Sequence, residues 1–213
     1  MTEADWLAEV GASRMVEFVR LRTSERKLRL FAAACCRSRW ADLTDPQTRK
    51  AVEVGEKYAD GKVSAKWLSR KWHAAYYSTV ASGFGNNTMT SLVWAALSCA
   101  MPVLREPPEL MAAVCYLDQD DIAFANTLTL PKLARCVFGN PFRPAAVNSS
   151  WLTFTVLALA ECIYADRAFD RLPILADALM DAGCDNEDVL SHCRSDGPHA
   201  RGCWVVDLIL GKS

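Results

Sequence analysis

Hydrophobic residues recur along most of the chain at the three- and four-residue intervals of an amphipathic helix. In one segment the apolar positions fall at i, i+3, i+4, i+7 and i+8, and they are Leu28, Phe31, Ala32, Cys35 and Cys36. This spacing places all five on one helix face. Alternating strand patterns and tight hairpin turns are scarce. The pattern therefore predicts an all-α fold, a compact multi-helix domain of about 9–11 helices packed as a bundle or in an irregular, helical-repeat-like way.

Residues that favour helix N-termini mark where several of these helices begin. Thr2, Ser24, Asp45 and Ser64 each precede a helix-periodic segment, and Asp45 is followed by Pro46 at the first helical position. We expect further helices near residues 13–21, 88–101, 107–117, 120–138, 149–165, 172–182, 186–194 and 200–210. The two prolines in residues 139–144, GNPFRP, predict an irregular turn there because proline lacks an amide donor.

The clearest loop in the sequence is SGFGNN at residues 82–87, which is rich in glycine and asparagine. The chain of 213 residues suits a single helical domain over 1–213. The loop also gives a boundary for a subdivision into N-terminal helices, 1–82, and C-terminal helices, 88–213.

Composition limits the classes of function. Lys and Arg number 24 against 25 Asp and Glu, so the net charge is −1, and a dedicated nucleic-acid binder is not expected. The nine cysteines do not form the dense framework of a small secreted domain, and the first ten residues do not resemble a signal peptide. No stretch reaches the roughly 20 continuous apolar residues of a membrane span. We therefore expect a cytoplasmic protein without a membrane partner.

The last thirty residues hold the densest group of metal-ligating residue types. The candidate ligands are Cys184, His192, His199 and Cys203. His199 and Cys203 are spaced i, i+4 and would share a face if a helix began by residue 199. Zinc is the cofactor that such a group would bind. The alternative is that the cysteines are buried core residues and the histidines donate hydrogen bonds to loop carbonyls.

Arg194 and His199 form an Arg-x4-His sequence that resembles the active-site motif of HEPN-type ribonucleases. In that chemistry arginine stabilises the developing phosphorane charge and histidine is the general acid or base, so both are catalytic candidates. Gly197-Pro198 would break the helix on which the motif normally lies. The alternative is that Arg194 caps one helix and His199 begins the next.

Four residues are candidates for binding contacts, namely Arg143, His192, Cys193 and Arg201. Arg143 stands in the turn at 139–144. We expect its guanidinium to pair with Asp207 or Asp170 and so to hold the ends of the protein together.

Five longer blocks carry a resemblance. They read RKLRLFAAACCRSRW, AVEVGEKYADG, GNPFRP, YADRAFDRLPILADALMDAGC and HCRSDGPHARGCWVVDLILGK. In these blocks the chain resembles a large family of uncharacterised planctomycete proteins, over about the first 62 residues and residues 135–213. Residues 63–134 depart from that family because they are richer in Trp, Tyr and Asn. The resemblance implies one cytoplasmic globular unit of bacterial origin, and it implies no activity, cofactor or partner.

Together these observations favour a protein–protein interaction or regulatory module without catalysis, whose partner is another protein. Its surface would include aromatic residues between positions 64 and 100, namely Trp67, Trp72, Tyr76, Tyr77 and Trp94. The alternative is a metal-binding or nuclease-like enzyme that uses the C-terminal Cys/His/Arg cluster. The residues do not identify a substrate or an oligomeric state.

Overall fold

The computed structural model describes residues 1–9, 11–81, 89–101 and 129–212. These residues form eleven α-helices and no strand, which confirms the predicted all-α fold. The helices are α1 (Glu3–Ala8), α2 (Ala12–Val19), α3 (Glu25–Ser38), α4 (Pro46–Ala59), α5 (Ala65–Ala81), α6 (Met89–Cys99), α8 (Thr129–Phe138), α9 (Phe154–Asp166), α10 (Leu172–Asp181), α11 (Glu187–Arg194) and α12 (Trp204–Ile209). Short 3-10 turns lie at Ser149–Trp151 and Phe169–Arg171.

The predicted N-terminal caps are present. Thr2 and Asp5 form a reciprocal capping box, in which the Asp5 amide donates to Thr2 Oγ1 at 3.2 Å and the Thr2 amide donates to Asp5 Oδ2 at 2.7 Å. Ser24 and Asp45 accept hydrogen bonds from the amides three residues later and begin α3 and α4. These local contacts explain why the starts of the early helices could be read from sequence.

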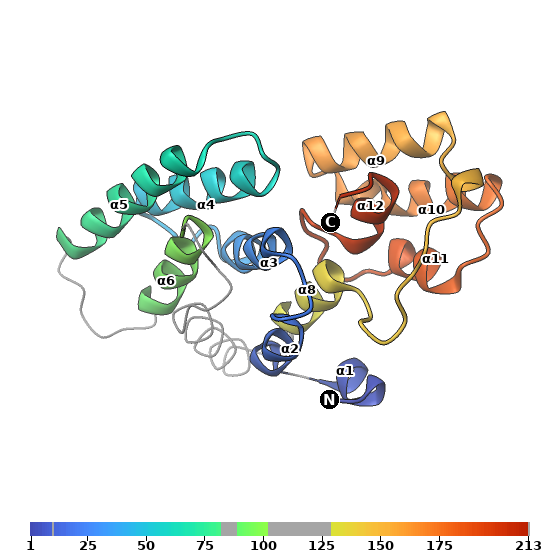
Figure 1. Ribbon diagram of the computed structural model, residues 1–213, viewed down its shortest axis with the longest axis horizontal. Helices are drawn as coiled ribbons and strands as arrows, with labels where there is room; N and C mark the ends of the chain where they lie inside the picture. The colour runs from blue at the N-terminus through green and yellow to red at the C-terminus, as the bar shows by residue number, and fades with distance from the viewer. Residues whose placement is uncertain (10, 82–88, 102–128, 213) are drawn as a thin grey trace.

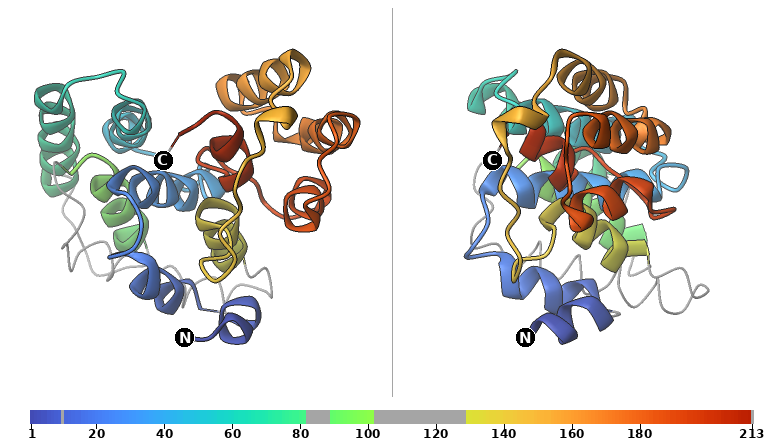
Figure 2. Two further views of the ribbon diagram at one scale, coloured as in Figure 1. Left: turned by 45° about the vertical axis from the view of Figure 1, so that its right-hand side comes forward. Right: turned by 90° about the vertical axis from the view of Figure 1, so that its right-hand side faces the viewer.

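The helices form two groups with α3 and α8 between them (Figure 1). The first group contains α4, α5 and α6, and the second contains α9 to α12. The left view of Figure 2 keeps the same order, and in its right view the second group lies in front of the first. One hydrophobic cluster lies mainly on α2, α3, α6 and α8, a second on α9 to α12, and a third on α4 to α6. The second cluster includes Cys136 of α8, so α8 joins it to the first.

Two buried or half-buried arginines fasten helix ends to this frame. Arg29, at 1% exposure, donates from Nη1 to the carbonyl oxygens of Cys99 at 2.6 Å and Met101 at 2.7 Å, which follow the last turn of α6. Arg135 donates from Nη2 to carbonyl oxygens of Trp6 at 3.0 Å and Glu9 at 2.6 Å at the end of α1. Both side chains satisfy carbonyls that helix ends leave without intrahelical donors.

The main difference from the predicted elements lies at the C-terminus. The helix expected over residues 200–210 begins only at Trp204, and residues 195–203 are irregular. Gly202 has a positive φ of 92°, and the Cys203 amide donates to the Ala200 carbonyl at 2.9 Å, so the chain turns before the helix begins. The helix expected at 107–117 and the first part of the one at 120–138 lie outside the described residues.

Within the described ranges no helix combines the length and the apolar character that crossing a bilayer requires.

Candidate metal centre

Four side chains from three parts of the chain meet at the junction of α8 with α11 and α12. They are Cys136, His192, His199 and Cys203, and one ligand atom from each lies within 4.8 Å of all the others. Both cysteines are buried and both histidines are half-buried. The structure thus brings together two thiols and two imidazoles, the ligand set of a Cys2His2 zinc site.

The helices explain how the ligands reach one another. Cys136 lies near the end of α8, where its neighbours pack against α3 and the second hydrophobic cluster. His192 lies in the last turn of α11, while the adjacent Cys193 points into the core at 0% exposure. The divergence follows from the angle of about 100° between successive helical residues. His199 and Cys203 lie in the irregular segment before α12.

The distances are close to those that a tetrahedral metal requires. Nε2 of His192 lies 3.2 Å from Sγ of Cys203, and Nδ1 of His199 lies 3.7 Å from Sγ of Cys136. With Zn–S bonds of about 2.3 Å and Zn–N bonds of about 2.0 Å, tetrahedral zinc would separate its ligand atoms by roughly 3.3–3.8 Å. A small adjustment of the side chains would therefore place all four atoms around one ion.

The second nitrogen of one imidazole has a partner that fixes its orientation. Nε2 of His199 lies 3.2 Å from the carbonyl oxygen of Ser195, so His199 can donate there and present Nδ1 to the cluster. Histidine ligands of zinc characteristically donate their other N–H to a carbonyl or carboxylate. The Ser195 amide donates to the His192 carbonyl at 3.3 Å, which ties this support to the end of α11.

The electrostatics of the cluster favour a thiolate on Cys203. Burial alone would raise the pKa of Cys203, but hydrogen bonds from Cys136, His192 and His199 hold that pKa well below its ordinary value. The hydrogen bond to Cys203 and burial raise the pKa of Cys136 well above its ordinary value. Burial lowers the pKa of His199, yet hydrogen bonds with Cys203 and Ser195 and the charge of Cys203 outweigh burial, so the net pKa is raised. These contacts favour the thiolate form of Cys203, which is the form that binds metals.

A groove of about 590 Å³ borders the cluster on the side of the two histidines. Its walls include Trp6 of α1, Arg135 of α8 and Asp188 of α11, and Cys136, His192 and His199 form part of its floor. The groove gives an ion a route to the ligands from solvent. It also explains why the histidines are less buried than the cysteines.

The structure brings three of the four candidate ligands together, His192, His199 and Cys203, and places the fourth elsewhere. Cys184 is 5% exposed and packs in the second hydrophobic cluster, and Cys136 stands in the group in its place. The expected shared helix face of His199 and Cys203 is also wrong, because the chain turns at Gly202 and the two side chains meet across that turn.

The other candidate residues lie apart from this cluster or in different contacts. Arg194, the last residue of α11, donates to Asp177 Oδ1 at 2.8 Å on α10, so the Arg-x4-His residues have separate partners and do not share a helix. Arg143 is 61% exposed and pairs with Glu3 at 2.6 Å. The predicted pairing of Arg143 with Asp207 or Asp170 is therefore wrong, because Asp207 binds Arg26 at 2.7 Å. The remaining candidate, Arg201, lies in a separate polar network.

Sequence reasoning missed Cys136 because 56 residues separate it from His192, and no local spacing connects the two. A signal was present in retrospect. Cys136 lies three residues before the GNPFRP turn, in a helix whose polar face includes Lys132 and Arg135. Only the packing of α8 against α12 shows that this cysteine faces the C-terminal histidines.

Comparison with known proteins adds no family. The chain matches no protein-family model, no curated protein and no solved structure.

Proposed function

We propose that this protein binds zinc through Cys136, His192, His199 and Cys203, and that the ion has a structural role. The observation that carries the proposal is the convergence of the four ligand atoms within 4.8 Å. Two thiolates and two imidazoles suit zinc better than the hard cations, which prefer oxygen ligands. The ion would fasten α8 to the segment that precedes α12, and so join the C-terminal helices to the rest of the fold.

Four protein ligands favour a structural over a catalytic centre. A catalytic zinc site typically keeps one position for water or substrate, whereas four protein ligands complete the tetrahedron. Both imidazoles are used as ligands, so neither is available as a general base at the ion. The proposal therefore keeps the expectation that the protein is not an enzyme and replaces the nuclease-like alternative with metal binding alone.

Elemental analysis of protein purified without chelators or metal-affinity columns tests the proposal. We expect about one zinc per chain, lost in Cys136→Ser and His199→Ala. Cys184→Ser is the matched control because Cys184 and Cys136 are both buried thiols, at 5% and 2% exposure, and only Cys136 faces the cluster. A wild-type protein that binds neither zinc nor cobalt(II), or a Cys184→Ser variant that loses the ion equally, would show the proposal to be wrong.

X-ray absorption at the zinc edge separates the structural role from a catalytic one. The proposal requires two sulfur and two nitrogen neighbours. An additional oxygen neighbour would indicate a bound water and would overturn the structural assignment while leaving zinc binding intact.

A second candidate function is contact with another protein through exposed aromatic residues. Trp72 and Tyr76 stack at 5.2 Å and pack beside the third hydrophobic cluster, but Tyr77 on the same helix is 64% exposed and Trp67 is 40% exposed. Aromatic side chains of this kind are favoured anchors at interfaces. Chemical crosslinking in cells should give adducts that Trp67→Ala with Tyr77→Ala removes. Phe154→Ala, at an exposed position on α9, should not remove them.

A cytoplasmic location and membership of the planctomycete family stay part of this proposal. The eight cysteines in the described ranges are all free thiols, which suits a reducing compartment. The resemblance rests on the five sequence blocks, and one of them, HCRSDGPHARGCWVVDLILGK, contains three of the four ligands.

A further inference from the structure

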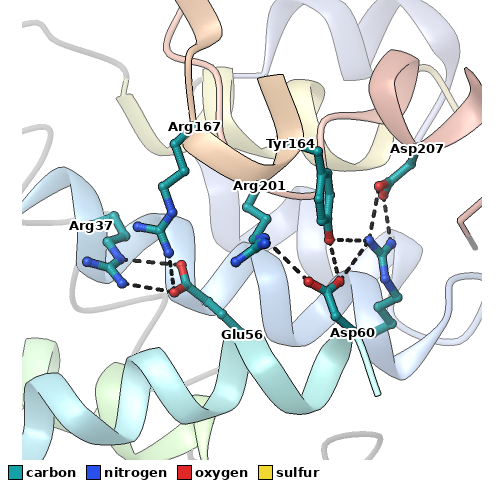
Figure 3. A network of polar contacts seen from close by, with 8 residues as sticks. Arg37, Glu56, Asp60, Tyr164, Arg167, Arg201 and Asp207 are labelled. Carbon is teal, nitrogen blue, oxygen red and sulfur yellow. Dashed lines mark hydrogen bonds and ion pairs between the residues drawn. The ribbon is translucent and has the colours of Figure 1, made fainter. Parts of the chain in front are cut away.

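A second polar centre lies where α3 and α4 meet the C-terminal helices (Figure 3). Its three carboxylates are Glu56, Asp60 and Asp207, and its cationic side chains are Arg26, Lys27, Arg37, Arg167 and Arg201. The acidic side chains are almost fully buried, at 1–4% exposure, and each is shared between two or more cations. Among these eight residues five cationic groups share three carboxylates, so positive charges outnumber negative ones by two.

The Glu56 carboxylate pairs with two arginines. Arg37 binds both of its oxygens, at 2.9 Å from Nη2 and 3.3 Å from Nε, and Arg167 Nη2 also binds Oε2. The carboxylate side chain is 4% exposed, and the two guanidinium side chains are 27% and 32% exposed. One carboxylate therefore neutralises only one of the two guanidinium charges that it holds together.

Arg201 is the least satisfied member of the network. Its guanidinium lies over the Tyr164 ring at 4.7 Å, and its Nε stands 3.4 Å from Asp60 Oδ2. The geometry does not make a hydrogen bond, since Arg201 Nε and Asp60 Oδ2 are both buried and without a hydrogen-bond partner. The side chain is only 13% exposed. A buried guanidinium nitrogen such as Nε, when it has no hydrogen-bond acceptor, is costly unless an anion or water supplies one.

A cavity of about 200 Å³ opens among these arginines. Arg37, Arg167 and Arg201 line it together with Glu56, and Leu133 and Phe169 contribute apolar walls. The volume lies below the roughly 300–1,000 Å³ of pockets for drug-sized ligands, so it suits a small ion or a small compound. Figure 3 shows the Arg167 guanidinium turned toward Glu56 and the Arg201 guanidinium turned toward Asp60.

The backbone at Arg167 is a separate observation at the same place. Arg167 has φ of 56°, and in the described ranges it is the one non-glycine residue with a positive φ. Glycine or asparagine usually occupies such a position at the end of a helix. Strained backbone conformations persist only where the surrounding contacts hold them, and they concentrate at functional sites. Arg167, which has this strained conformation, also binds Glu56 through its guanidinium and lines the cavity.

We propose that this cavity binds a small oxyanion, phosphate or a small compound that presents a phosphate group, between Arg167, Arg201 and Arg37. Guanidinium groups match phosphate oxygens with paired hydrogen bonds, and the excess of positive charge around the cavity supplies the attraction. The anion would bridge Arg201, just before α12, to Arg167, at the end of α9. His199 of the metal cluster also lines this cavity, but none of the three arginines is a ligand of that cluster, so the anion would bind to side chains that the zinc proposal does not use.

Titration calorimetry with inorganic phosphate, at constant ionic strength set with sodium chloride, tests the site on the full chain. We expect saturable binding to one site and an affinity about tenfold weaker in Arg167→Gln, since one guanidinium clamp is removed. Arg14→Gln is the control because Arg14 is 73% exposed and pairs with Glu9 away from the cavity. Absence of phosphate-specific binding in the wild type, or an unchanged affinity in Arg167→Gln, would overturn the proposal.

A second variant, which should raise the affinity for phosphate, strengthens the test. Glu56→Gln removes the negative charge that competes with the anion for Arg37 and Arg167, so the affinity for phosphate should rise by about threefold or more. A network that serves only to hold helices together predicts no such rise. An unchanged or weaker affinity in Glu56→Gln would place the anion elsewhere and reject the assigned cavity. Titrating Cys136→Ser in parallel shows whether binding persists without the metal ligand, as the proposal requires.

Discussion

The ammonium nitrogen of Lys27 lies 2.8 Å from the carbonyl oxygen of Gly202, the residue directly before Cys203. The same nitrogen lies 3.0 Å from the carbonyl oxygen of Val137, the residue directly after Cys136. Lys27 also pairs with Asp207 at 2.6 Å. One side chain of α3 thus holds the backbone on both sides of the cluster, and it does so without being a ligand.

Lys27→Met should weaken zinc binding because the two cysteine segments lose their common anchor while the apolar stem is kept. We expect an affinity about tenfold weaker, the scale of effect of residues that orient metal ligands. Asp207 keeps its two contacts with Arg26, at 2.7 Å and 3.0 Å, so the fold should survive. Competition with a chromophoric chelator measures the affinity. Lys66→Met, an exposed position on α5, is the control, and equal affinities in the two variants would contradict the role of Lys27.

Gly202→Ala should damage both stability and metal binding. A Cβ at Gly202 would stand 3.0 Å from Leu30 Cβ, and the φ of 92° is one that alanine rarely adopts. Gly183→Ala isolates the cost of the backbone conformation from the cost of the Leu30 contact, because Gly183 has a φ of 83° and nothing lies within 4 Å of the added Cβ. We expect a loss of about 1–2 kcal/mol in unfolding free energy for Gly183→Ala, from the backbone conformation alone.

The loss in Gly202→Ala should exceed that value, because Leu30 or the turn must move as well. Zinc affinity should fall only in Gly202→Ala, since the turn there sets the direction of Cys203. Denaturant unfolding and chelator competition on both variants give the two readings. Equal losses in both variants would mean that the Leu30 contact relaxes without cost.

Much of the helical framework follows from local sequence. Thr2, Ser24 and Asp45 cap the helices that they were predicted to begin, because a cap needs only its own amide neighbours. Periodicity also predicted the apolar face that carries Cys35 and Cys36, and both are buried. The predicted start of the last helix, near residue 200, was wrong. The helical pattern continues through Gly202 in the sequence, but the positive φ of Gly202 turns the chain before α12 begins.

The metal cluster was only partly predictable for a different reason. His192, His199 and Cys203 are close in sequence, so their residue types drew attention to them. The packing of α8 places Cys136 in the metal cluster. Cys184 is not part of that cluster because it packs in the second hydrophobic cluster. Of the arginine network only Arg201 was among the binding candidates, and the network itself was not predicted. Its members come from α3, α4, α9 and the segment before α12, and each reads alone as an ordinary surface charge.

Arg29→Met should destabilise the fold strongly, although Arg29 stands far from the proposed metal site in sequence. The substitution leaves the carbonyls of Cys99 and Met101 without their donor in a buried environment. We expect a loss of about 3 kcal/mol in unfolding free energy. Lys50→Met is the control because Lys50 and Glu53 form an exposed pair, 44% and 37% exposed, worth about 0.5 kcal/mol or less. Similar midpoints of urea unfolding in the two variants would refute a structural role for Arg29.

Tyr164→Phe should show a stability difference that depends on pH. Tyr164 is 5% exposed; its hydroxyl donates to Asp60 and accepts from Arg26 Nη2 at 2.7 Å. Burial, followed by the hydrogen bond to Asp60, raises the pKa of Tyr164 above its ordinary value of 10.0. At pH 8 the phenol is protonated in the folded and the unfolded chain, so the variant lacks only the hydrogen bonds. We expect it to be about 1–2 kcal/mol less stable than the wild type there.

Above pH 10 the raised pKa of Tyr164 lowers the unfolding free energy of the wild type. The unfolded chain then loses the phenolic proton while the folded chain keeps it, so the unfolding free energy of the wild type falls by up to about 1.4 kcal/mol per pH unit. Tyr164→Phe has no proton to lose at this position, so the gap between the two proteins should narrow from pH 10 and close near pH 11. Urea unfolding of both proteins at pH 8, 10 and 11 measures that gap. A stability difference that stays constant with pH would mean that the Tyr164 hydroxyl ionises equally in the folded and the unfolded chain. Burial and the hydrogen bond to Asp60 would then not raise its pKa.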